Sequence, residues 1–133
     1  MSAEEYLDRI NQLDAIIRNR EEEYKRLVAL ASGLGALSLS ERVQSSRDLH
    51  GAQNTIARYI DLEREIDRLK AKRQELLSVI ESLPTVEYKI IDRFYLQDVS
   101  LKVIACDFHR SYDWAKKNKR KALEHLQSMI DGE

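Results

Sequence analysis

The chain has 133 residues, enough for one modest domain or for a small domain attached to an elongated helical one, and this size disfavours most enzyme folds. Hydrophobic residues make up 43% of the chain and charged residues 34%, with four Gly and one Pro, a profile that favours long helices over a sheet-rich protein. The formal net charge of -1 does not mark a nucleic-acid binder, so any such function must rest on how the charge is distributed.

Cysteine content and the start of the sequence indicate the compartment. Cys106 is the single cysteine, which excludes an intramolecular disulfide and suits a reducing environment. The first residues lack the basic and apolar regions of a signal peptide, and no apolar run approaches the ~20 residues of a membrane span. We therefore expect a cytoplasmic protein that does not associate with a membrane.

The first predicted element is a long amphipathic helix over residues 3–31. Its apolar residues are spaced by threes and fours, as a helix stripe or a coiled-coil seam requires, with one interruption at Arg20. These residues are Leu7, Ile10, Leu13, Ile17, Tyr24, Leu27 and Ala31. Ser32, Gly33 and Gly35 break the pattern, and we interpret residues 32–51 as a connection.

A second long helix is predicted over residues 52–83. Its apolar residues are again spaced by three and four, with one interruption at Arg73. Its stripe consists of Tyr59, Leu62, Ile66, Leu69, Leu76, Ile80 and Leu83. Such a helix is ~48 Å long, so its stripe needs a cover. The cover is the first helix folded back as an antiparallel hairpin, the same helix of another subunit, or both in a four-helix bundle. We predict that residues 1–83 are a helical oligomerisation region and that the protein is a homo-oligomer.

Residues 84–133 predict three helices joined by short links, which completes an all-α fold. Pro84 marks the boundary, and Thr85 is predicted to cap a helix that ends near Leu96. Ser100 is predicted to cap the next helix, and a turn at residues 109 and 110 follows it. Ser111 is then predicted to cap a final helix from Tyr112 to about residue 130.

The spacing in the last two helices, together with their charge, predicts a DNA-binding helix-turn-helix. Ile104, Ala105 and Phe108 supply the apolar, small and apolar residues of the first helix, and His109 stands at the chain reversal. Residues 116–121 carry five positive charges and no acid. Residues 1–83 hold 13 Lys and Arg against 15 Asp and Glu, whereas residues 84–133 hold 9 against 8, so the positive charge is concentrated on one helix.

The same residues resemble a known domain and a known family. Ile104-Ala105, Phe108, Ser111, Ala122-Leu123 and Leu126 line up without a gap on the pattern I-A-x-x-L-G-x-S and A-L-x-x-L of bacterial sigma factor region four, and residues 83–95 look like its preceding helix. Residues 41–46, 60–63 and 95–105 together resemble phage-encoded transcriptional regulators of the RinA and ArpU type, from Gram-positive bacteria and their prophages. This resemblance implies a regulator that activates late, packaging or lysis genes.

The resemblance also implies which residues bind double-stranded DNA. It places Tyr112, Asp113, Lys116 and Lys117 at the positions from which a recognition helix reaches base edges, with Arg120 and Lys121 nearer the phosphates. Arg110 in the turn and Ser111 complete the predicted set, and Lys102 is a secondary phosphate candidate. The chain departs from the pattern at three positions. His109 replaces the turn glycine and must take a left-handed conformation, while Arg110 and Asn118 replace apolar residues.

The remaining residue patterns indicate neither a metal site nor a catalytic site, and two further functions stay open. Cys106, His109 and His125 do not supply the four ligands of a structural zinc site, and no motif indicates a catalytic site, a cofactor or a small-molecule substrate. We therefore expect a non-enzymatic protein. The alternatives to a regulator are a phage assembly component resembling a small terminase subunit, and a module that binds RNA polymerase or a sigma factor with little DNA affinity of its own.

Overall fold

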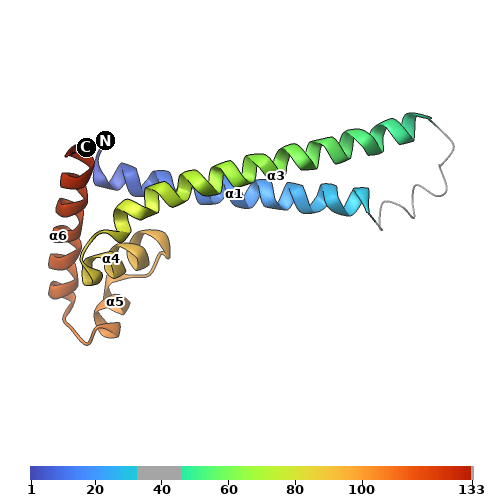
Figure 1. Cartoon of the computed structure of the whole chain (residues 1–133). Helices are drawn as coiled ribbons and strands as arrows, with labels where there is room; N and C mark the ends of the chain where they lie inside the picture. Colours follow the sequence, from blue (N-terminus) through green and yellow to red (C-terminus); the bar gives the residue numbers. More distant parts are fainter. Residues whose placement is uncertain (33–45, 133) are drawn as a thin grey trace. The chain divides into compact units, whose positions relative to one another are not determined.

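The computed structural model describes residues 1–32 and 46–132, with side chains from Gln53 onward in the second part, and every regular element among these residues is helical (Figure 1). The elements are α1 (Ala3–Ala31), α3 (Ser46–Glu81), α4 (Thr85–Ile91), the π-helical turn η1 (Asp92–Leu96), α5 (Leu101–Asp107) and α6 (Tyr112–Asp131). The predicted all-α class is thus confirmed. Within the described ranges, no helix is both long and apolar enough to cross a bilayer.

Two of the three predicted helix caps are confirmed. The Ser100 hydroxyl accepts a hydrogen bond from the Val103 amide at 3.3 Å, and the Ser111 hydroxyl accepts one from the Trp114 amide at 3.1 Å. The cap predicted at Thr85 is wrong, because α4 begins at that residue and Pro84 is its N-cap. Pro84 has an extended ψ of 146°, and its carbonyl accepts the first helical hydrogen bond, from the Tyr88 amide at 2.9 Å.

The start of the second long helix also differs from the prediction. α3 begins at Ser46, so the expected connection over residues 32–51 is wrong for its last six residues. Apolar periodicity reports a buried stripe and not helicity itself, and residues 46–51 contain one large apolar residue, Leu49, so they give no such signal. The remainder of that predicted connection, residues 33–45, lies outside the described residues, as does most of the 41–46 segment that carries part of the family resemblance.

The helices form two compact units, and α1 and α3 each contribute to both. The terminal unit comprises Met1–Asp14 and Lys72–Glu133, and the paired-helix unit comprises Ala15–Ala71. The predicted domain boundary at residues 83/84 follows chain order and stays a prediction. By packing, the first fourteen residues belong with the last fifty.

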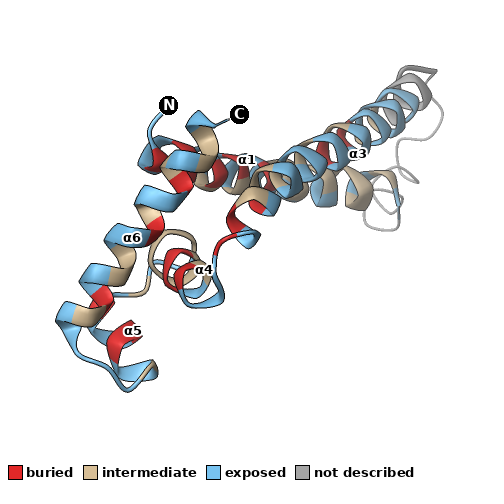
Figure 2. Ribbon diagram, turned by 60° about the vertical axis from the view of Figure 1, so that its left-hand side comes forward, coloured by how far each residue is buried: buried red, intermediate tan, exposed pale blue. Residues whose placement is uncertain are grey.

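The core of the terminal unit joins the start of α1 to the end of α3, to α4 and to α6 (Figure 2). Its largest fully buried side chains are Leu7, Ile10, Ile80, Ile91 and Leu126. A second cluster lies under α5 and holds the start of α6, and it consists of Ile90, Leu101, Ile104, Ala105 and Ala115. Because both clusters include residues of α6, the position of that helix depends on the hydrophobic core of the whole unit.

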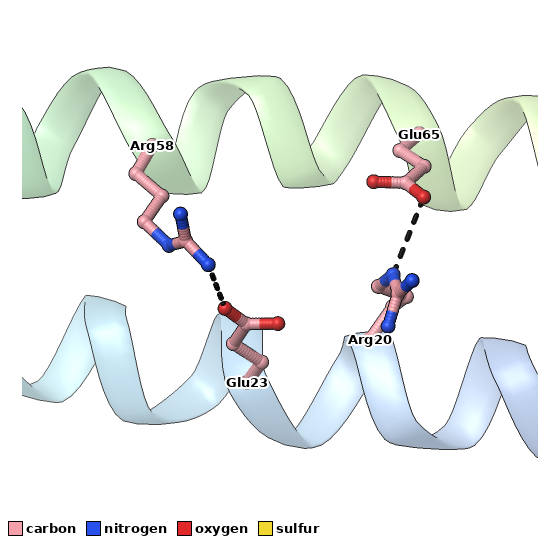
Figure 3. Close-up of polar contacts among 4 residues, drawn as sticks. All are labelled: Arg20, Glu23, Arg58 and Glu65. Carbon is pink, nitrogen blue, oxygen red and sulfur yellow. Dashed lines mark hydrogen bonds and ion pairs between the residues drawn. The ribbon is translucent and has the colours of Figure 1, made fainter.

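In the paired-helix unit, α1 and α3 of one chain lie antiparallel and cover each other's stripe with Ile17, Leu62 and Ile66. Cross-helix ion pairs flank this seam, and two of them join Arg58 to Glu23 at 2.6 Å and Arg20 to Glu65 at 3.2 Å (Figure 3). A third joins Lys70 to Glu21 at 3.3 Å. The hydrogen bond from Arg58 lowers the pKa of Glu23 below its ordinary value. Partly exposed pairs of this kind contribute little stability, so we infer that they fix the register of the helices.

The two charged interruptions of the apolar stripes have the same explanation. Arg20 of α1 pairs with Glu65 of α3 in the paired-helix unit, and Arg73 of α3 pairs with Asp14 of α1 in the terminal unit. Each arginine therefore finds its carboxylate on the opposite helix of the same chain. Among the covers considered above, the structure shows the first helix of the same chain within each unit.

Candidate nucleic-acid interface

The turn between α5 and α6 has the geometry of a Schellman motif, the common way to end a helix with one left-handed residue. The Arg110 amide donates to the Ala105 carbonyl at 2.9 Å, and the His109 amide donates to the Cys106 carbonyl at 3.0 Å. His109 has a φ of 55°, so it takes the left-handed conformation expected from its position. For a residue with a Cβ this costs about 1–2 kcal/mol, and the packing around the turn must offset that cost.

Aromatic packing supports the turn from the α6 side. The rings of Phe108 and Trp114 have centroids 5.4 Å apart, and the Arg110 guanidinium lies 5.7 Å from the Trp114 ring. The Asn118 amide donates to the Trp114 carbonyl at 2.9 Å, so this polar residue stabilises α6 at a position where the resemblance expects an apolar one. Trp114 therefore acts in packing, against the turn after α5.

A hollow of about 890 Å³ lies over α5 and α6 and is bordered by basic side chains. Lys102 of α5 and Lys116, Lys117, Lys119 and Arg120 of α6 line it, together with a single acid, Asp113. Its remaining lining is Phe94, Ser100, Leu101, Tyr112 and Leu123. Five positive charges against one negative charge, around one concavity, produce a local potential that attracts polyanions although the chain as a whole is slightly acidic.

Aromatic rings hold two of these lysines in place. The Lys119 ammonium lies 4.3 Å from the centroid of Phe94 and 5.6 Å from that of Tyr95, and the Lys116 ammonium lies 5.4 Å from that of Tyr112. Phe94 and Tyr95 belong to η1, and their rings make an edge-to-face contact at 4.9 Å. We infer that Lys119 supports the fold, whereas the more exposed Lys116, Lys117 and Arg120 are accessible to a ligand.

The structure brings five of the predicted DNA-binding residues together around the hollow: Tyr112, Asp113, Lys116, Lys117 and Arg120. Arg110, Ser111 and Lys121 do not line it, although Ser111 caps α6 and Arg110 contacts Trp114. Sequence reasoning missed Phe94, Ser100 and Lys119. Lys116, Lys119 and Leu123 are spaced by three and four residues and so share one face of α6, a signal that would have identified Lys119.

Sequence reasoning also missed a polar contact that fixes α6 on α4. Glu87 is buried, with 6% of its surface exposed, and its carboxylate lies 2.6 Å from Nδ1 of His125. A buried carboxylate needs a partner, and here the partner is 38 residues away in the chain. His125 is itself largely exposed, so the pair joins a buried carboxylate of α4 to a surface imidazole of α6.

Replacement of His125 with alanine is expected to destabilise the terminal unit by about 1–3 kcal/mol, because it leaves the buried Glu87 side chain without its imidazole partner. Urea unfolding measures this change. The matched control is Glu124→Ala at the adjacent exposed position, for which we expect a change within about 0.5 kcal/mol. Equal shifts for the two variants would contradict a structural role of the pair.

Comparison with known proteins finds no matching family model and no significant match among curated proteins or solved structures.

Proposed function

We propose that this protein is a sequence-specific DNA-binding transcriptional regulator in which α5 and α6 form a helix-turn-helix and α6 is the recognition helix. The observation that carries the proposal is the gathering of five basic side chains and one acid around a single hollow on these two helices. The left-handed Schellman turn and the caps at Ser100 and Ser111 support it, because they define a short helix and a longer one, separately capped and joined by a tight reversal.

The charges of the α6 side chains suggest a separate role in DNA binding for each. Lys116, Lys117 and Arg120 supply phosphate attraction and can donate to guanine, while Asp113 can accept a hydrogen bond from cytosine N4. Tyr112 is 45% exposed and can contact a thymine methyl or a phosphate. In keeping with the family resemblance, we propose a cytoplasmic phage or prophage regulator of late, packaging or lysis genes that binds paired half-sites as a homo-oligomer.

Selection of bound sequences from a random duplex library at ~150 mM salt tests the proposal, since weak electrostatic binding is substantially screened at that concentration. We expect a defined motif, and an inverted repeat if the protein binds as a symmetric dimer. Recovery of nothing above background would refute sequence-specific binding. Ring-shaped assemblies seen by electron microscopy would instead support the small-terminase-like alternative.

One feature of the hollow favours a second candidate function, binding to RNA polymerase or a sigma factor. Phe94, Leu101 and Leu123 give the hollow an apolar part, which suits a protein segment better than a phosphate backbone. Co-purification of polymerase with the wild-type chain, together with weak binding to every duplex, would favour this candidate.

A further inference from the structure

The basic hollow has a neighbour of a different character at the far end of α6. A second hollow, of about 290 Å³, is lined by Ser2, Ala3 and Glu4 of the N-terminal segment and by Arg120, Leu123, Glu124 and Gln127 of α6. Arg120 and Leu123 line both hollows. Arg120 therefore lines one hollow that holds four lysines and another that holds two glutamates.

Glu4 is brought to this place by the core of the terminal unit. The Ala3 amide donates to the Gln127 side-chain oxygen at 2.7 Å, and the Gln127 amide group donates to the Met1 carbonyl at 3.1 Å. Ala3 and Leu7 are buried in the same cluster as Leu126, so the first turns of α1 are packed against α6. The view in Figure 1 agrees, since the start of α1 lies beside the end of α6.

The acidic residues at the start of α1 also influence Tyr95 of η1. Burial raises the pKa of the Tyr95 phenol, and the negative charges of Glu4 and Asp8 raise it further. Tyr95 also lies under the Lys119 ammonium, so the acids of α1 stand near the same aromatic pair that holds a lysine of the basic hollow. The start of α1 is also tied to η1, because the Asn11 side-chain amide donates to the Tyr95 carbonyl at 2.8 Å. The lining of the second hollow and this hydrogen bond thus place the acidic start of α1 at the edge of the basic surface.

We propose that Glu4, supported by Glu124, is an acidic border beside the basic hollow that weakens the binding of a polyanion there and ends the phosphate path at Arg120. The inference rests on the proposed DNA-binding function and specifies how that site is limited. It implies that phosphates contact the N-terminal half of α6 and are repelled from its C-terminal half, because like charges in proximity oppose binding.

Charge reversal at Glu4 tests the border, with Glu5 as the matched control. Both acids lie in the first turn of α1, where they interact equally with the helix dipole, but Glu5 does not line the second hollow. Glu4→Lys is expected to tighten nonspecific duplex binding about three- to fivefold more than Glu5→Lys does, measured by fluorescence anisotropy of the full chain at several salt concentrations. Circular dichroism checks that both variants keep their helix content.

Elution from immobilised heparin separates the failure of this inference from that of the proposed function. If Glu4→Lys elutes at higher salt than Glu5→Lys although no duplex is bound, the border holds and DNA is the wrong polyanion. If the two variants elute together and bind duplex equally, Glu4 does not limit the hollow, whether or not the protein binds DNA.

Discussion

Simultaneous replacement of Lys116, Lys117 and Arg120 with alanine is expected to weaken duplex binding about 100-fold at ~150 mM salt. Each phosphate contact that is removed reduces the slope of log affinity against log salt by about 0.9, so three contacts reduce it by about 2.7. Anisotropy titrations over a range of salt concentrations give both the affinity and the slope. All three side chains are exposed, so the helix content and the unfolding midpoint should change little.

A triple variant elsewhere in the chain controls for the loss of net charge. Lys25, Arg68 and Lys72 are exposed and lie outside the basic hollow, and their replacement with alanine removes the same charge. We expect this variant to bind with a salt slope within about one unit of the wild type. Equal losses in the two triple variants would show that the overall charge, and not the hollow, attracts the duplex.

Lys121 shows where the sequence-based choice of DNA-binding residues differs from the lining of the hollow. It belongs to the DNA-binding set that the sequence predicts, but it lies outside the hollow that Lys117 and Arg120 line. Five charges in six residues must encircle a helix, because successive residues are turned by about 100°. The sequence therefore locates the basic helix correctly without showing which of its lysines share a face with α5.

The fold could be predicted where periodicity and caps carry the information. The spacing of apolar residues by three and four predicts the bounds of α1, and the serine caps predict the starts of α5 and α6. Both signals depend on residues that are close together in the chain. The π-helical turn at η1 has no such local signal. The spacing that suggests a continuous short helix ending near Leu96 does not show that its last five residues change to π geometry.

The partners of each helix face could not be predicted, because periodicity reveals a face and not what covers it. Glu87 and His125 are unremarkable in sequence, and their contact follows only from the way α4 and α6 pack. The same limit applies to Leu7, which the sequence pattern places in the apolar stripe of the predicted oligomerisation region. In the structure it lies in one cluster with Leu77 of α3 and with Ala122 and Leu126 of α6.

Leu7→Ala is expected to destabilise the terminal unit by about 2–5 kcal/mol, a large part of the total stability of a small protein. The Leu7 side chain is fully buried, so its truncation leaves a cavity against the cluster that holds α6. Trp114 is the only tryptophan of the chain and lies in α6, which makes its fluorescence a probe of the terminal unit. Urea unfolding followed by this fluorescence measures the change.

Leu30→Ala is the matched control, because Leu30 lies on the same helix but is 58% exposed and belongs to the paired-helix unit. Its truncation should change the free energy of unfolding by less than about 0.5 kcal/mol. If Leu7→Ala left the Trp114 transition unchanged while it reduced helicity measured by circular dichroism, residues 84–133 would fold as an independent domain. A shift of the Trp114 transition would instead show that the first turns of α1, Glu4 included, are part of the unit that holds the proposed recognition helix.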